Sequence, residues 1–181
     1  EVEWALAVQA GREPGPLPPP VQLTVIDGSG WLIVPGLINT HHHLFQSLTR
    51  GLPDAQNVPL FEWLTRLYPV WQRVDYRAVH QAALVSLAEL LLSGCTLTSD
   101  HAYLFPPGSD VRLEATVEAA EKLGIRIHAG RGAMSLGRSA GGLPPDECVE
   151  PEDRILADCE RVIAQYHDPT PMAMRRIDLA P

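Results

Sequence analysis

Cysteine is scarce in this sequence. Three cysteines, Cys95, Cys148 and Cys159, occur among 181 residues, and no two of them have the C-x-x-C spacing. An odd number of cysteines without that spacing indicates neither a disulfide framework nor a zinc site built from thiolates. We therefore expect ordinary thiols, buried or without a chemical role.

Basic residues and long apolar runs are also in short supply. There are 14 Lys and Arg against 22 Asp and Glu, a net charge of −8, whereas a nucleic-acid-binding protein normally presents a basic face to the phosphates. No apolar run reaches the roughly 18 residues that a membrane-spanning helix requires, and residues 1–4 lack the features of a secretory signal. We expect a cytoplasmic protein with neither nucleic acid nor a membrane as its partner.

The sequence contains enough apolar material for a core, because 45% of its residues are hydrophobic and only 20% are charged. A loop rich in proline and glycine at residues 11–20 is followed by short apolar or alternating runs. These runs predict strands at residues 21–28, 31–34 and 37–40, so that the first forty residues are mostly β.

From residue 75 onward, helical and strand patterns alternate. Three helices are predicted from their capping residues and their apolar spacing, namely Asp75 to Gly94, Asp110 to Gly124, and Pro151 to Tyr166. Strands follow them, at residues 96–100, 125–129 and 176–180.

Repeated strand and helix units indicate an α/β fold with a parallel sheet. No GxGxxG or Walker loop follows a predicted strand, which favours a closed barrel over a doubly wound nucleotide-binding sheet. A complete eightfold barrel needs roughly 250 residues, so the sequence holds about the first half of one. We expect it to be the first part of a longer protein.

The most informative residues are Asn39-Thr40-His41-His42-His43, where the first barrel strand is expected to end. Alternate side chains of a strand share a face, so His41 and His43 point one way and His42 the other. Two imidazoles at the C-terminal mouth of a barrel form half of a metal site. The alternative is a fortuitous histidine run or a tag remnant, although a tag would lie at a terminus and would not continue an apolar strand.

Residues 34–43, with the sequence VPGLINTHHH, resemble the PG(L/F)(I/V)(D/N)THxH signature of the amidohydrolase superfamily, in its cytosine/guanine deaminase and triazine hydrolase branch. Five further segments are similar to the group of 8-oxoguanine and isoxanthopterin deaminases: residues 43–50, 91–96, 100–106, 131–137 and 141–145. The resemblance covers residues 21–181.

The resemblance implies a fold and a metal. Residues 1–35 would be part of a small β-sandwich domain, and residues 36–181 the first four βα units of a truncated (β/α)8 metallo-hydrolase barrel. His41 and His43 would be two ligands of one divalent metal, usually zinc and sometimes iron. The catalytic acid/base Glu, His and Asp of the family are expected C-terminal to residue 181, so none lies in this sequence.

Four residues are candidates for binding the substrate. Gln46 matches a position where purine deaminases of this branch place an amide on the substrate ring, since an amide offers both a donor and an acceptor; its alternative is to face solvent. His101 and Tyr103 follow the second barrel strand and Arg131 the third, so all three are expected to reach the same mouth. An arginine there could hold a ring carbonyl or an anionic purine. Alternatively, Arg131 pairs with a loop carboxylate and Tyr103 packs.

Two further features keep two interpretations each. Asp100 either orients a neighbouring histidine or caps the loop that follows its strand. The aromatic residues of the first strand-to-helix connection either pack together or form a wall over the substrate; they are Phe61, Trp63, Tyr68 and Trp71.

The function implied is hydrolytic deamination of an amino-substituted oxidised purine or pterin, such as 8-oxoguanine, isoxanthopterin or guanine, with water as the second substrate. One alternative is a triazine amino- or chlorohydrolase of the same superfamily. The other is a non-catalytic metal-binding module, if the protein ends at residue 181. Members of the family are commonly homo-oligomers, so a homo-oligomer is a further implication of the resemblance.

Overall fold

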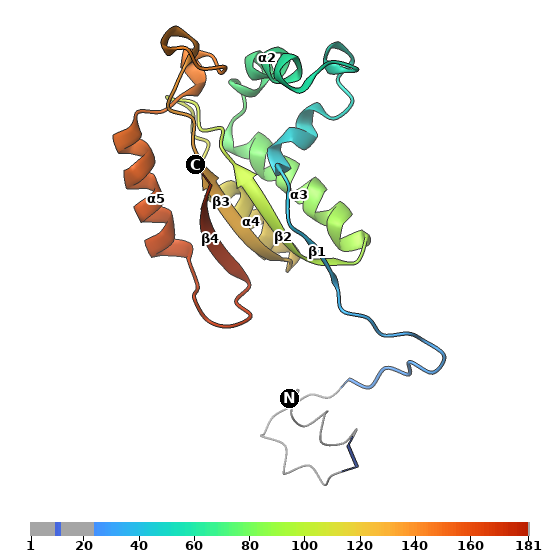
Figure 1. The fold of residues 1–181 in the computed structure, drawn as a ribbon. Helices are drawn as coiled ribbons and strands as arrows, with labels where there is room; N and C mark the ends of the chain where they lie inside the picture. The colour runs from blue at the N-terminus through green and yellow to red at the C-terminus, as the bar shows by residue number, and fades with distance from the viewer. Residues whose placement is uncertain (1–9, 12–23, 181) are drawn as a thin grey trace. The chain divides into compact units, whose positions relative to one another are not determined.

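The computed structural model describes residues 10–11 and 24–180 of the chain (Figure 1). The chain divides into two compact units, residues 1–34 and residues 35–181. All the helices and strands among the described residues belong to the second unit. The assignment of residues 1–35 to a β-sandwich stays a prediction.

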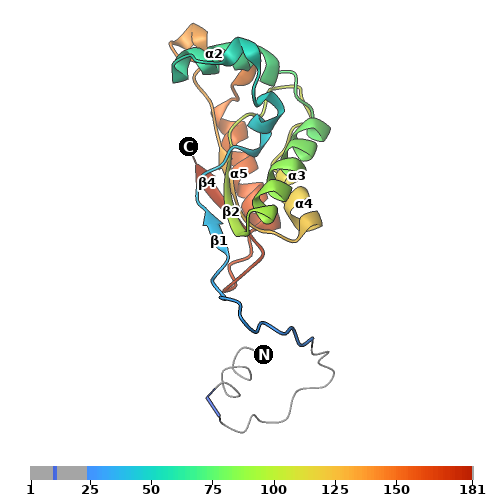
Figure 2. The same cartoon turned by 90° about the vertical axis from the view of Figure 1, so that its right-hand side faces the viewer.

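Four parallel strands form the sheet of the second unit. They are β1 (Leu37–Asn39), β2 (Cys95–Ala102), β3 (Arg126–Gly132) and β4 (Arg175–Ala180), and they lie in the order β1-β2-β3-β4. The helices between them are α3 (Tyr76–Leu92), α4 (Glu114–Leu123) and α5 (Glu152–Tyr166). Figure 2 shows these three helices on one face of the sheet. A doubly wound sheet carries helices on both faces, whereas a barrel keeps sequential strands inside one helical layer. The predicted α/β fold, part of a (β/α) barrel, is therefore confirmed.

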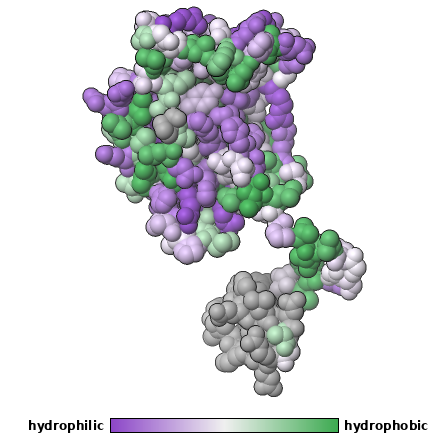
Figure 3. All heavy atoms as spheres, viewed as in Figure 1, coloured by the Kyte–Doolittle hydropathy of each residue, from purple (hydrophilic) through white to green (hydrophobic). Residues whose placement is uncertain are grey.

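The open face of the sheet is the one that a complete barrel would enclose. Side chains on this face include Ser99, His128 and Asp178, and none of them is fully buried. Figure 3, which views the molecule from this side, shows hydrophilic residues mixed with hydrophobic ones. The apolar core lies instead between the sheet and the helices, where Val117, Ile127 and Val162 are buried.

The helix signals at Asp75 and Gly94 are confirmed. The Asp75 carboxylate accepts a hydrogen bond from the Ala78 amide at 2.7 Å, and Gly94 follows α3 with a φ of +87°. The signal at Asp110 is wrong, because α4 begins at Glu114. The Asp110 carboxylate accepts instead from the Tyr76 amide at 2.8 Å, so it caps the start of the neighbouring helix α3.

The predicted N-terminal strands differ from the structure. Residues 21–23 and most of the loop at 11–20 lie outside the described residues, and residues 24–34 contain no strand. Instead, Asp27 accepts hydrogen bonds from the amide and hydroxyl of Ser29, and the Trp31 amide donates to the Gly28 carbonyl. An alternating run becomes a strand only beside a pairing partner. Of the predicted runs before residue 41, only the one that forms β1 has such a partner among the described residues.

The first connection holds a helix that the sequence pattern did not predict. The chain passes through the 3-10 turns η1 (Leu44–Thr49) and η2 (Pro53–Ala55) into α2 (Leu60–Trp71), which lies beyond the C-terminal ends of the strands (Figure 1). Pro69 stands inside α2 and argues against a helix. Burial of Leu67, Tyr68 and Trp71 against the core holds this segment nevertheless.

Strands β2 and β3 continue past their predicted ends, to Ala102 and Gly132. The connection after β3 contains two further 3-10 turns, η3 (Arg138–Ala140) and η4 (Asp146–Cys148). All three cysteines are free and buried, as expected. Among the described residues, no helix is both long and apolar enough to cross a membrane. The cytoplasmic localisation stays a prediction.

Candidate metal and substrate site

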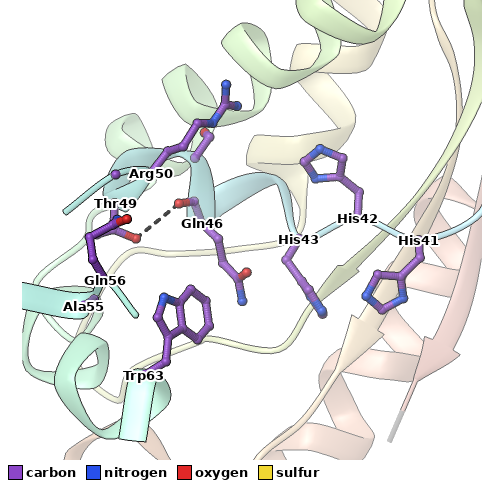
Figure 4. Close-up of a pocket in the computed structure, with 11 residues that line it drawn as sticks. His41, His42, His43, Gln46, Thr49, Arg50, Ala55, Gln56 and Trp63 are labelled. Carbon is purple, nitrogen blue, oxygen red and sulfur yellow. Dashed lines mark hydrogen bonds between the residues drawn. The ribbon is translucent and has the colours of Figure 1, made fainter. Parts of the chain in front are cut away.

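The histidine segment connects β1 to η1 at the C-terminal edge of the sheet. Figure 4 shows the side chains of His41 and His43 on one side of this segment and that of His42 on the other, in accordance with strand alternation. The ring centroids of His41 and His43 lie 4.9 Å apart, with perpendicular ring planes. The two imidazoles can therefore approach one common point from different directions.

His43 is oriented by the neighbouring strand. Its Nδ1 lies 2.7 Å from the carbonyl oxygen of His101. Because a carbonyl oxygen can only accept, Nδ1 must carry the proton, and Nε2 of the neutral ring keeps its lone pair. Burial lowers the pKa of His43, which favours this neutral form. A histidine held in this way presents Nε2 to a metal.

Asp100 supports the same segment and is almost completely buried. Its Oδ1 accepts from the Leu44 amide at 2.8 Å, and burial raises the pKa of its carboxyl to about 7 although Leu44 and Thr116 donate hydrogen bonds to it. Asp100 therefore caps the loop that follows the histidine segment. The hydrogen bonds of its carboxylate come from Leu44 and Thr116, not from a histidine ring or the loop after β2 that the sequence suggested.

Gln46 and Tyr103 form a pair across this edge of the sheet. Nε2 of Gln46 donates to the Tyr103 hydroxyl over 2.9 Å, and the ring of Tyr103 lies edge-on to His43, with centroids 5.3 Å apart. Burial raises the pKa of Tyr103, so the phenol stays protonated. The pair leaves the Gln46 carbonyl oxygen as an acceptor and the Tyr103 hydroxyl hydrogen as a donor.

Two cavities share His41, His43, Gln46 and Trp63 as lining residues. The smaller cavity, of about 470 Å³, extends toward Arg50 and Gln56 (Figure 4). The larger cavity, of about 710 Å³, is also lined by His101, Tyr103, Leu60, Leu64, Tyr68, Ala133 and Met134. A planar heterocycle fits this size and this mixture of apolar walls and a few polar groups.

Three of the four aromatic residues of the first connection pack together, since the rings of Trp63 and Tyr68 lie edge-on to that of Trp71, with centroids 5.3 and 5.8 Å apart. Trp63 and Tyr68 line the larger cavity, Phe61 is 69% exposed, and the buried Trp71 donates from Nε1 to the Thr49 hydroxyl. Sequence reasoning missed the apolar wall formed by Leu60, Leu64, Ala133 and Met134. Apolar residues at positions 60, 63, 64 and 67 have helical spacing, and this signal could have predicted the part of the wall that α2 forms, Leu60 and Leu64.

Arg131 is not part of either cavity, contrary to expectation. Its side chain is 1% exposed and points into the helical layer. Nε donates to Asp158 of α5 at 2.8 Å, Nη2 to both oxygens of Glu150 at 3.0 Å, and the guanidinium stacks 3.7 Å above the Phe105 ring. The alternative of pairing with a loop carboxylate therefore describes Arg131. The reason is alternation along β3, where Ile127, Ala129 and Arg131 all face the helices.

The residues present fit a divalent metal such as zinc. His41 and His43 offer imidazole nitrogen, a ligand that zinc and iron both accept. Within the described residues, no group of three or more His, Cys, Asp or Glu side chains could hold a metal ion. These two imidazoles alone cannot complete a metal site, so further ligands would have to come from elsewhere.

Comparison with known proteins gives the family. Residues 32–175 match the sequence model of the amidohydrolase family. The chain is 49% identical over 155 residues to 8-oxoguanine deaminase of Pseudomonas aeruginosa, covering 86% of this chain and 34% of that protein. It is 40% identical over 170 residues to isoxanthopterin deaminase of an unknown prokaryotic organism, covering 92% and 35%.

A solved structure agrees with this result. Atrazine chlorohydrolase of Arthrobacter aurescens TC1, complexed with zinc, is 41% identical with a TM-score of 0.73, and the match covers 80% of this chain and 34% of that one. This chain spans about a third of the length of the relatives it matches. Amidohydrolases depend on metals. The family match extends from β1 with its histidine segment into β4, and the chain belongs to the amidohydrolase family.

Proposed function

We propose that the whole protein is a metal-dependent deaminase of an amino-substituted oxidised purine or pterin. In this proposal the chain supplies two metal ligands, His41 and His43, and one wall of the substrate cavity. The observation that carries it is the meeting of the two histidines with the Gln46–Tyr103 pair in one cavity. Identity to the 8-oxoguanine and isoxanthopterin deaminases supports the choice of substrate class.

The chemistry is hydrolysis of a C–N bond. Water adds to the amino-bearing ring carbon, and the bond from that carbon to nitrogen breaks. The products are a ring carbonyl and ammonia, so that one water is consumed for each ammonia released. A divalent metal, when bound, supplies the Lewis acidity that makes water a nucleophile near neutral pH. We propose zinc for this role, with iron as the alternative.

The residues of this chain then bind and orient. His41 and His43 hold the metal, and the hydrogen bond of His43 to the His101 carbonyl keeps Nε2 free for that purpose. Gln46 and Tyr103 present an acceptor and a donor side by side, which matches a lactam edge of an oxidised purine or pterin. The acid/base carboxylate lies outside this chain in our proposal.

Trp63 and Tyr68 line the same cavity as these polar groups. Their rings offer a flat apolar surface to a planar substrate and reduce its contact with water. Arg131 has no place in this proposal, because its guanidinium is fully engaged with carboxylates on the helical side.

A triazine hydrolase is the second candidate, supported by the 41% identity to the atrazine chlorohydrolase. It would use the same histidines and the same attacking water with a different leaving group. Monocyclic triazines are smaller than purines, so the two candidates differ in the size of the ring that must contact Gln46 and Tyr103.

The test is ammonia release by the zinc-loaded whole protein. 8-Oxoguanine, isoxanthopterin, guanine, cytosine and an aminotriazine are offered separately at equal concentration. We expect turnover of a bicyclic oxo-substrate, lost in His43→Ala and kept in His80→Gln. His80 is the matched control because it lies on α3 and lines neither cavity.

Two results would contradict the proposal. Silence across the bicyclic substrates, from protein shown to contain its metal, would exclude the purine or pterin deaminase. Turnover of the triazine alone would then establish the second candidate. Activity that persists in His43→Ala would remove this histidine from the metal site.

A further inference from the structure

The end of β2 holds three consecutive residues, His42, His43 and Leu44, through hydrogen bonds. The His101 amide donates to the His42 carbonyl at 2.8 Å, the His101 carbonyl accepts from Nδ1 of His43 at 2.7 Å, and Asp100 accepts from the Leu44 amide. The peptide of His101 thus fixes both the backbone before His43 and the ring of His43 itself.

The ring of His101 makes a separate contact, farther across the sheet. Its Nε2 lies 3.0 Å from the carbonyl oxygen of Ala180, at the end of β4. Because that oxygen only accepts, Nε2 carries the proton and donates. Strand β3 lies between β2 and β4, so the imidazole must pass over β3 to reach its partner.

Gly132 makes this crossing possible. A Cβ at position 132 would lie 2.5 Å from Nε2 of His101 and 2.8 Å from Cβ of Tyr103. Gly132 has no positive φ, so its backbone conformation would accept any residue. The absence of a side chain therefore provides room for the His101 ring, not conformational freedom.

We infer that His101 is a positioning residue of the metal site. Its ring ties the end of β2 to the end of β4 across Gly132, and this tie holds the His101 carbonyl against Nδ1 of His43. The carbonyl in turn keeps the Nε2 of His43 as the nitrogen that binds metal. The substrate contact expected from sequence stays a prediction for His101, which also lines the larger cavity, and the inference rests on the proposed function only in taking His43 as a ligand.

Substitution separates the ring from the peptide, because any residue at position 101 keeps the amide and the carbonyl. In the whole protein, His101→Ala removes the donor to Ala180, whereas the side-chain amide of His101→Gln can replace it. Zinc affinity is measured by competition with a chromophoric chelator, with circular dichroism as the check on folding. Loss of a group that orients a ligand typically costs 10–100-fold in metal affinity.

We expect zinc affinity to fall roughly 10–100-fold in His101→Ala and to return most of the way in His101→Gln. His80→Gln controls for the loss of a histidine elsewhere and should bind zinc as the parent does. Unchanged affinity in folded His101→Ala would overturn the inference, as would an equal loss in His101→Gln. His43→Ala distinguishes the two possible failures. If this variant also binds zinc as the parent does, His43 is not a ligand and the proposed metal site fails; if it loses zinc, only the positioning role of His101 fails.

Gly132→Ala tests the same inference without touching His101. The added methyl group displaces the ring, so zinc affinity should fall in the same direction as in His101→Ala. Removing the ring removes the collision with Nε2 and leaves only the close approach to Cβ of Tyr103, so the loss of zinc affinity in the double variant should be smaller than the sum of the two single losses. Additive losses in the double variant would show that the two residues act independently and would overturn the inference.

Discussion

Two clusters of titratable side chains lie at the carboxyl ends of neighbouring strands, and they are built in opposite ways. The histidine cluster, His41, His43 and His101, lines a cavity. The arginine cluster, Arg131 with Glu150 and Asp158, is closed on itself, since Nε, Nη1 and Nη2 of Arg131 all donate to protein oxygens. By contrast, Nε2 of His43 has no hydrogen-bond partner within the described part of the chain.

One residue of strand register separates the two outcomes. In the pairing of β2 with β3, His101 lies opposite Gly130 and Arg131 lies opposite Ala102. Residues directly opposite each other on neighbouring strands point to the same side. Arg131 therefore shares the helical side with the buried Ala102, and His101 shares the cavity side with the two glycines of β3. A side chain near the end of a barrel strand can reach the mouth of the barrel only if strand alternation places it on the inner face of the sheet.

The largest effect is expected from removing the Nε2 of His43, the histidine nitrogen without a hydrogen-bond partner among the described residues. His43→Ala should reduce zinc affinity by more than the roughly 10–100-fold that an orienting partner contributes, and ammonia release should fall with it. The fold should persist, because the ring is only partly buried. Zinc content after dialysis and the unfolding midpoint of the metal-free protein measure these outcomes. Full zinc occupancy in the variant would contradict the first of them.

The arginine cluster should respond in the reverse manner. Arg131→Met leaves the mostly buried Glu150 without its partner, while Asp158 keeps Arg161, and this should lower the free energy of unfolding by about 3–5 kcal/mol. Zinc stoichiometry of the folded fraction should stay at the parental value. Urea denaturation checks the first result and metal analysis the second.

The control for that experiment is the double variant Arg131→Met/Glu150→Gln. Removing one unpaired carboxylate should restore part of the lost stability. If Arg131→Met were as stable as its parent, the carboxylates would have found other partners. The arginine cluster would then not stabilise the fold, contrary to the comparison drawn above.

Sequence reasoning could find the histidine cluster because two of its members, His41 and His43, lie only two positions apart and follow alternation over three residues. It placed Arg131 wrongly because β3 runs three residues beyond its predicted end, and parity cannot be counted along a strand of unknown length. The partners Glu150 and Asp158 lie 19 and 27 residues away and belong to other elements. No local pattern connects them to Arg131.

The same limit explains the other differences. Helix α3 was predictable because its capping aspartate and terminal glycine are local signals. The N-terminal runs have strand patterns, but a strand also needs a partner. Helix α2 depends on burial of Trp71 and Leu67, which overrides the proline inside it.

Asp100 shares a property with each cluster: it is buried like Arg131, and it supports the loop next to the histidines. We expect a smaller effect on stability from its titration than from loss of Arg131. Burial raises the pKa of its carboxyl from 3.8 to about 7, so over this range the folded state holds a proton that the unfolded state has lost. Raising the pH through that range should therefore destabilise the parent, by no more than ~1.4 kcal/mol per pH unit. Asp100→Asn keeps the acceptor for Leu44 and removes the titration. Parallel stability curves for the two proteins between these pH values would contradict the prediction.

The smallest effect is expected at Arg50, which repeats the chemistry of Arg131 in water. Its two terminal nitrogens donate to both oxygens of Glu89 at 2.9 and 2.8 Å, but the two side chains are 58% and 52% exposed. Water solvates both groups when the pair breaks, and salt screens their attraction, so Arg50→Gln should leave the urea midpoint unchanged at low and high salt. A loss comparable to that of Arg131→Met would mean that burial does not control ion-pair stability here. An unchanged midpoint would agree with control by burial, since the Arg50 side chain is 58% exposed and that of Arg131 is 1% exposed.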